Sequence, residues 1–166
     1  MTLYLPIGPP ACGKTFLRHL SVSAQVIKAS AAVSTDDFRE QLTDDWWNQE
    51  ENAAMFAMVE KISVIRLRRG LDVWLDATNL SGTTPYVEAA RTFGHDVISI
   101  LFDTPKKVCL YRNAHRDHPV PWDSEDDPML RMMKQWMNIK PEDLPGLVIP
   151  SSAYIEQLEY TARTLA

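Results

Sequence analysis

The stretch GPPACGKT, residues 8–15, decides the fold of this chain. It directly follows the short apolar run LYLPI, residues 3–7, which is typical of a buried strand, and it leads into residues 15–23, which have the pattern of a helix. Glycine, four residues, glycine, lysine and then serine or threonine, set between a strand and a helix, is the pattern of a phosphate-binding loop, or P-loop. The sequence therefore predicts nucleotide binding.

The residues of this loop have distinct expected roles. Gly8 and Gly13 let the backbone turn its N–H groups onto the phosphates, Lys14 reaches the β and γ oxygens, and the Thr15 hydroxyl holds Mg²⁺. Cys12 stands at a variable position, where a small space-filling side chain is the simpler interpretation. The residues predicted to bind the nucleotide here are Gly8, Pro9, Ala11, Cys12, Gly13, Lys14 and Thr15.

Length and composition favour one globular domain over residues 1–166, with 45% hydrophobic and 23% charged residues. The start, MTLYLPIG, lacks the features of a signal peptide, and no stretch is long enough to span a bilayer, so we expect a cytoplasmic protein without membrane partners. Cys12 and Cys109 lack a CxxC pairing and are expected to be free thiols. The net charge of −5 argues against coating long nucleic acid but allows a grip on one end through a few arginines.

Strand, loop and helix patterns alternate along the chain, which predicts a doubly wound α/β domain: a parallel sheet flanked by helices, like that of P-loop kinases, with functional loops at the carboxyl ends of the strands and a helical lid at about 112–127. Met55, Met58, Val59, Ile62 and Ile65 recur at helical spacing. The expected strands are 3–7, 25–28, 72–75, 95–103 and a last one in 144–152, with 29–35 as a loop. The expected helices are 15–23, one beginning at 36–37, 51–69, 85–93, 106–116, one around 129–136, and 154–165.

The stretch STDDFRE, residues 34–40, holds the candidate for the acceptor side of the reaction. In a doubly wound domain it lies across the cleft from the P-loop, where the Asp36 carboxylate could take the proton from an attacking hydroxyl. Arg39, one helical turn on, could clamp an anionic group of the acceptor beside that base. The alternative interpretation is that Ser34 or Thr35 caps the helix and the carboxylates favour its first turn.

Two further motifs carry charge. Asp76 ends the apolar strand of LDVWLDATN and is placed like the carboxylate that meets Mg²⁺ in P-loop proteins. Arg112 and Arg116, four residues apart in one expected helix, fall on one face and could supply the positive charge that phosphoryl transfer needs, or could form a solvated basic helix end.

Acidic and aromatic residues nearby have simpler interpretations. The acids of DHPVPWDSEDDP are expected to face solvent or an oligomer partner rather than to form a metal cluster; they are Asp123, Glu125, Asp126 and Asp127. Trp46, Trp47 and Trp122 could stack on a base, although core or interface positions are the more common use of tryptophan.

Four motifs, GPPACGKT, STDDFRE, DATNL and YRNAHRDHPVP, occur in an order and spacing that resemble the 5′-kinase module of polynucleotide kinases from bacteriophages and bacteria, over residues 8–121. The resemblance implies that Asp36 activates a 5′-hydroxyl and that Arg39 binds an acceptor phosphate. It implies that Arg112 and Arg116, in a lid, contact the phosphate donor and neutralise charge in the transition state.

In the same family, the residues matching Thr78 and Asn79 help to shape the acceptor site, although some members have aspartate where this chain has Ala77. Read from the residues alone, Thr78 and Asn79 turn the chain and cap the next helix. The chain lacks the DxDGT sequence of the phosphatase domain found beside many such kinases, so no phosphatase domain and no action on 3′ phosphates are predicted.

These observations lead to an expected activity. The leading expectation is an enzyme that uses Mg²⁺ or Mn²⁺ to move the γ-phosphate of ATP or GTP to the 5′-hydroxyl end of DNA or RNA in nucleic acid repair; a homo-oligomer is left open. The alternative is a P-loop kinase of a sugar acid, a drug or a nucleotide sugar, which the acidic net charge favours. A nucleotide-dependent binding or switch protein is a third, for which Asp36 and Arg39 have no obvious purpose.

Overall fold

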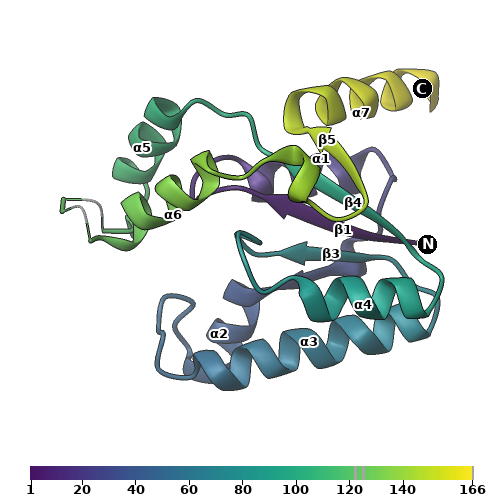
Figure 1. The fold of residues 1–166 in the computed structure, drawn as a ribbon, viewed down its shortest axis with the longest axis horizontal. Coiled ribbons are helices and arrows are strands. Elements are labelled where there is room, and N and C mark those ends of the chain that lie inside the picture. Colours follow the sequence, from purple (N-terminus) through teal and green to yellow (C-terminus); the bar gives the residue numbers. More distant parts are fainter. Residues whose placement is uncertain (122, 125, 166) are drawn as a thin grey trace.

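A computed structural model describes residues 1–121, 123–124 and 126–165, with side chains to residue 160. Its centre is a five-stranded parallel sheet in the order β2-β3-β1-β4-β5 (Figure 1). The strands are β1 Thr2–Ile7, β2 Ala32–Ser34, β3 Val73–Asp76, β4 Asp96–Leu101 and β5 Leu147–Pro150. This order places the P-loop strand in the middle, so the loop after β1 lies between the loops after β3 and β4.

Helices cover both faces of the sheet, as parallel strands require because each needs a crossover connection. They are α1 Lys14–Ser23, α2 Thr35–Thr43, α3 Asn52–Arg68, α4 Thr84–Thr92, α5 Lys106–Ala114, α6 Pro128–Met137 and α7 Ser151–Leu165, with short 3₁₀ turns at Ala29–Ala31 and Pro141–Asp143. Helices α3 and α4 lie on one side and α1 and α7 on the other (Figure 1). The predicted doubly wound α/β fold is confirmed.

Strand β1 shows how the two faces of the core are built. Its side chains alternate: Leu3 and Leu5 are fully buried in the apolar cluster beneath α3 and α4, while Tyr4 points into the cluster beneath α1 and α7. Trp74 of β3, fully buried, stacks on Tyr4 with 5.7 Å between ring centroids. A strand buried on both faces has to be apolar throughout, which is why LYLPI was readable as one.

The second strand lies elsewhere than the sequence predicted. Residues 25–28 form a turn after α1, begun by Gln25 in the left-handed region at φ 56°, and Ile27 is buried against the α1 and α7 side of the core. Strand β2 instead uses Ala32–Ser34, within the stretch expected to be a loop, and pairs Val33 with Leu75. The prediction was wrong because a three-residue edge strand with one large apolar side chain has too little pattern to see.

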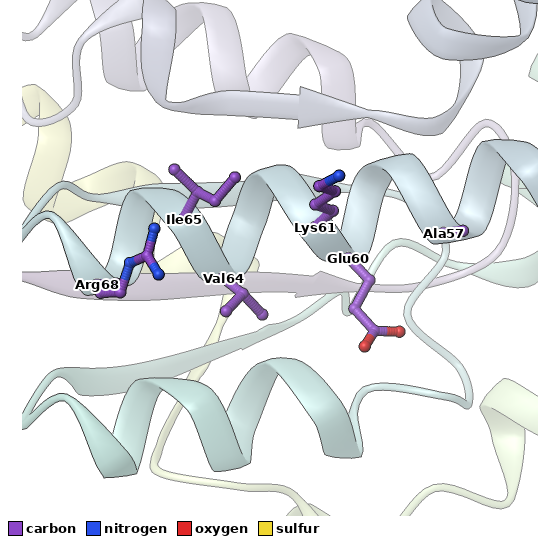
Figure 2. A pocket seen from close by; sticks show the side chains of 6 residues that line it. All are labelled: Ala57, Glu60, Lys61, Val64, Ile65 and Arg68. Atoms are coloured by element: carbon purple, nitrogen blue, oxygen red, sulfur yellow. The ribbon is translucent and has the colours of Figure 1, made fainter.

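Helix α3 buries a narrower stripe than its sequence suggested. The buried positions are spaced by four residues, at Met55, Val59, Ser63 and Leu67, while Ile65, which shares the helical spacing of the apolar residues, is 40% exposed. A shallow open depression of about 480 Å³ runs along the outer face of this helix and is lined by α3 side chains alone (Figure 2). Helix spacing locates an apolar face but not its width.

In the part of the chain with described coordinates, every helix is too short or too polar to cross a bilayer.

Candidate active site

The P-loop joins β1 to α1 in a shape that glycine permits at two positions. Gly13 has a φ of 113°, which side-chain-bearing residues avoid. At Gly8, a Cβ atom would lie 2.7 Å from the Cys12 Sγ and 2.9 Å from the Phe102 Cβ, so a side chain has no room. The Gly8 N–H donates to the Thr78 carbonyl over 3.1 Å, which fastens the loop to the segment after β3.

Lys14, the first residue of α1, folds back over its own loop. Its Nζ donates to the carbonyl oxygens of Gly8 at 2.9 Å and Pro9 at 2.7 Å. The ammonium is therefore held at the loop by backbone oxygens, while the helix N-terminus behind it favours an anion.

Cys12 is buried beneath this loop, with 2% of its surface exposed. Burial raises the pKa of its thiol, although the nearby Lys14 ammonium opposes the rise. Its carbonyl accepts from the Thr104 Oγ1 at 2.8 Å, so the loop after β4 also braces the P-loop. The cysteine occupies space inside the loop, as expected, and donates no chemistry that the geometry requires.

Asp76, at the end of β3, forms an ion pair that the sequence reasoning missed. The Arg18 Nη1 lies 2.8 Å from the Asp76 Oδ2, with the two side chains 18% and 10% exposed. Burial raises the pKa of Asp76, Arg18 and Lys14 oppose the rise, and the carboxylates of Asp36 and Asp37 add to it. A signal was present, because Arg18 follows Lys14 by four residues and so lies on the same face of α1.

Asp36 lies in the first turn of α2, and the helix cap leaves its carboxylate available. The Ser34 Oγ accepts from the Asp37 N–H at 3.2 Å, so Ser34 caps the helix, one of the two residues proposed for that role. Arg39 holds Asp36 from one turn on, with 2.7 Å between Arg39 Nη1 and Asp36 Oδ1, and its Nε donates to the Asn52 Oδ1 at 3.2 Å. The Asp36 side chain is 56% exposed. It is thus oriented but accessible.

A single cleft of about 1400 Å³ at the carboxyl ends of the strands brings these residues together. The predicted site residues that line it are Ala11, Cys12, Gly13, Lys14, Thr15, Asp36, Arg39, Asp76, Thr78, Asn79, Arg112 and Arg116. Gly8 and Pro9 are buried behind the loop and are not part of this lining, so their contribution is to its shape. Asp36 and Lys14, the predicted base and the predicted phosphate-binding lysine, both line this cleft.

Thr78 and Asn79 both line the cleft. The Asn79 Nδ2 donates to the carbonyl oxygens of Pro6 at 2.9 Å and Leu75 at 2.8 Å, and its φ is 52°. This side chain therefore shapes the turn after β3, as the simpler interpretation of this loop expected. The expectation that Thr78 and Asn79 cap the next helix is wrong, because α4 begins at Thr84 with Thr83 as its N-cap. A role for either residue in acceptor binding stays a prediction.

Arg112 and Arg116 do not share a helix face. Helix α5 ends at Ala114, so Arg116 lies beyond it, and the prediction of one helix through residue 116 is wrong. The reason is Asn113, fully buried, whose side chain donates to the Val120 carbonyl at 2.8 Å and accepts from the Val120 N–H at 3.0 Å. These bonds turn the chain back. The Arg112 Nη1 nonetheless reaches the P-loop, 3.8 Å from where a Gly13 Cβ would lie.

Arg116 contacts a tryptophan in the segment that follows α2. Its Cζ lies 5.4 Å from the ring centroid of Trp46, in the connection between α2 and α3, and the His118 ring lies 5.5 Å from the same indole. Trp47 packs edge-on to Trp46 at 5.3 Å and also joins the core. The connection between α2 and α3 and the segment that follows α5 lie on the same side of the molecule in Figure 1. The predicted lid thus contacts the segment that carries the tryptophans.

Some predictions concern residues that lie outside the described part of the chain, namely Trp122 and Glu125. Asp127 accepts from the Ser124 N–H at 2.7 Å and stands before α6. Among the residues with described coordinates, no group of three or more histidine, cysteine, aspartate or glutamate side chains is arranged to hold a metal.

Comparison with known proteins gives a family and a fold. A family model described as an AAA domain matches residues 3–140. Similar solved structures include a Chloroflexus aurantiacus protein provisionally assigned as a kinase, with a TM-score of 0.60 and 17% identity over 99% of this chain and 96% of that chain. Another is shikimate kinase from Acinetobacter baumannii in complex with shikimate, with a TM-score of 0.59 and 17% identity over 99% of this chain and 92% of that chain.

A gluconokinase from Sinorhizobium meliloti has a TM-score of 0.51 and 12% identity over 97% of this chain and 87% of that chain. A search of curated proteins finds no match. At these identities the similar structures show the fold, which is that of P-loop kinases, and leave the acceptor open.

Proposed function

This chain belongs to the AAA domain family, and on that premise we propose that it is a kinase that moves the γ-phosphate of ATP or GTP to a hydroxyl group of a small molecule. The observation that carries the proposal is that Asp36, at the start of α2, and Lys14, in the P-loop, line one cleft. A protein that only bound or hydrolysed nucleotide would have no use for an oriented carboxylate on the acceptor side.

The donor side is formed by the P-loop, Lys14 and the two arginines. Lys14 and the N-terminus of α1 hold the β and γ phosphates, and Arg112, whose guanidinium lies by Gly13, approaches the same phosphates from the lid. Arg116 also lines the cleft, and its positive charge helps to neutralise the negative charge of the phosphoryl group that is transferred.

The residues present fit a magnesium ion. Thr15, with its hydroxyl, and Asp76, with its buried carboxylate, line the same cleft. Mg²⁺ is usually bound by one or two protein oxygens together with phosphates and water. When bound, the ion would neutralise charge on the phosphates. Arg18 holds one oxygen of Asp76 and so fixes the direction in which the other points.

On the acceptor side, Asp36 would act as the general base. The acceptor hydroxyl gives its proton to the Asp36 carboxylate as its oxygen bonds to the γ-phosphorus, and the bond from that phosphorus to the β–γ bridging oxygen breaks, which releases the nucleoside diphosphate. Arg39 donates to one carboxylate oxygen, so it orients the base while the exposed side chain remains reachable.

The charges of the cleft favour a small acceptor over a nucleic acid end. The cations among its described lining residues are Lys14, Arg39, Arg112 and Arg116. Arg39 is paired with Asp36, and the other three are assigned to the donor, which leaves no row of cations for the backbone phosphates of a polynucleotide. Similar structures of small-molecule kinases point the same way.

A polynucleotide 5′-hydroxyl kinase remains the second candidate, because the pair of Asp36 and Arg39 has the spacing that the sequence resemblance ascribes to that activity. The test incubates the protein with Mg²⁺, ATP labelled at the γ-phosphate, and a panel of neutral and acidic sugars, aryl glycosides, nucleosides and a 5′-hydroxyl oligonucleotide. We expect label on a small acceptor. Label on the oligonucleotide alone would replace the proposal with the second candidate, and release of free phosphate alone would favour a switch protein.

A further inference from the structure

The cleft is lined in part by aromatic side chains that the transfer reaction itself does not need. We propose that the acceptor is an uncharged hydroxyl compound that bears an aromatic ring, with the ring held by Trp46, Phe56 and Tyr86, here called the aromatic wall. The inference rests on the proposed kinase function, since it names the class of molecule that would stand between this wall and Asp36.

Phe56 is the most telling member of the wall. It comes from α3, it lines the cleft, and 49% of its surface is exposed. A large apolar side chain left open inside a concave site gains stability when a ligand covers it, and sites for organic ligands are lined in this way. Val59, three residues on in α3, and Tyr86, the wall member from α4, also line the cleft and are buried, with 0% and 7% of their surfaces exposed.

The carboxylates that line the cleft disfavour an anionic acceptor. Glu60 and Asp36 both line the cleft, and the cation that α2 contributes, Arg39, is already engaged by Asp36. Burial raises the pKa of the Tyr86 phenol, and the nearby Glu60 carboxylate raises it further, so the phenol stays neutral and can donate a hydrogen bond. A carboxylate on the acceptor would meet two negative groups, whereas a neutral ring with hydroxyl groups would meet apolar surface and hydrogen-bonding partners.

Trp46 is held in place before any acceptor arrives. Its indole is braced edge-on by Trp47 at 5.3 Å and by His118 at 5.5 Å, and the Arg116 guanidinium lies 5.4 Å from its ring centroid. Binding against a braced ring costs little further ordering of the protein, which favours stacking of a flat ligand. The same indole contacts an arginine assigned to the donor, so a ring bound here would lie close to both halves of the reaction.

The first experiment measures binding by calorimetry, with Mg²⁺ and a non-hydrolysable ATP analogue present. Phenyl β-D-glucoside is compared with methyl β-D-glucoside, and thymidine with methyl 2-deoxyriboside, because each pair differs by an aromatic ring. The ring should tighten binding at least about tenfold in one pair or both, the order expected for stacking on aromatic side chains. The pair with the larger gain tells whether an aryl glycoside or a nucleoside is the better occupant. Equal binding within both pairs would overturn the inference.

Charge is tested with phenyl β-D-glucuronide, which adds a carboxylate to the phenyl glucoside. We expect the glucuronide to bind several-fold more weakly than the glucoside, and tighter binding of the glucuronide would overturn the uncharged class. Transfer of label is measured separately. Tighter binding of the ring-bearing compounds without transfer of label would contradict the kinase function and support the aromatic site. Transfer of label without a difference in binding within the pairs would support the kinase function and contradict the aromatic site.

Variants assign the effect to the wall. Phe56→Ala should remove most of the discrimination within the better pair and leave binding of the ATP analogue unchanged, while Trp46→Phe, which keeps an aromatic ring, should retain it. Phe93→Ala is the matched control, because Phe93 is 39% exposed, follows α4 and lies outside the cleft lining. Equal loss in Phe56→Ala and Phe93→Ala would show that the wall does not hold the ring.

Discussion

The guanidinium of Arg18 lies 2.8 Å from the carboxylate of Asp76, which links the P-loop helix to the end of the neighbouring strand β3. Both side chains are mostly shielded from water, with 18% and 10% of their surfaces exposed. A pair in this setting adds little net stability over an apolar pair, but the loss of one partner leaves the other charge buried and uncompensated. The pair is therefore sensitive to single substitutions.

We predict that Arg18→Met lowers the free energy of unfolding at neutral pH by roughly 3 kcal/mol, the cost of breaking a buried ion pair. Urea denaturation followed by circular dichroism measures it. The control His19→Ala, at an exposed neighbouring position on α1, should change little. In the double variant with Asp76→Asn, much of the loss should be recovered, and a simple sum of the two single effects would contradict the coupling.

The defect of Arg18→Met should also depend on pH. Burial raises the pKa of Asp76 above its ordinary value of 3.8, and Arg18 is the strongest influence that opposes the rise. Without Arg18 the folded-state pKa rises further, so the penalty of a buried carboxylate is full at neutral pH and is lost as the pH falls through that raised pKa. The stability gap between variant and wild type should narrow on acidification. A gap that widens would show that the carboxylate is not the source.

Asn113 is predicted to hold the lid segment in place. Its side chain makes two hydrogen bonds with the backbone of Val120 in a fully buried position. The substitution Asn113→Ala therefore leaves the N–H and the carbonyl of Val120 without these partners. We expect a loss of about 2 to 3 kcal/mol in unfolding free energy and a higher KM for ATP, because Arg116 lies between the two anchored residues. Lys107→Ala, on an exposed position of α5, is the control. Unchanged stability of Asn113→Ala would contradict the anchor.

Both cysteines should be unreactive in the folded protein. Burial raises the pKa of the Cys12 thiol, and burial together with the neighbouring Cys12 raises the pKa of Cys109 to about 11. Since the thiolate is the reactive form, a disulfide reagent such as Ellman's reagent at pH 8 should modify the native protein slowly and should titrate both thiols rapidly in guanidinium chloride. Rapid modification of one equivalent in the native state would contradict the burial of one of the two thiols.

Most of the fold could be predicted from the sequence because its strands, its P-loop and its helices are specified by local patterns of residues. The strand, P-loop and helix around residues 3–23 are specified by a run of neighbouring residues, and each later strand buried on both faces stands out as an apolar run. Strand β2 was not predicted because Ala32–Ser34 is short and has small side chains. Its position is set by pairing with β3, which the local sequence pattern does not reveal.

The site could be predicted where a motif fixes the position of a residue. It could not be predicted where that position depends on contact with a side chain far away in the sequence. Asp36 and Lys14 face one cleft as expected, because parallel strands bring their following loops to one edge. The end of α5 depends instead on Asn113 meeting Val120, and the aromatic wall depends on three separate segments meeting. The partner of Asp76 was in reach of spacing arguments, since Arg18 lies one turn from Lys14.

The central claim is that Asp36, across the cleft from the P-loop, takes the proton of the acceptor. The most direct measurement is single-turnover transfer of labelled γ-phosphate by Asp36→Asn, with binding of the ATP analogue measured in parallel and Asp37→Asn, a neighbouring exposed carboxylate, as the matched control. We predict a loss of transfer of about 100-fold or more in Asp36→Asn, with nucleotide affinity near that of wild type, and near-normal transfer in Asp37→Asn. Full transfer by Asp36→Asn would contradict the account.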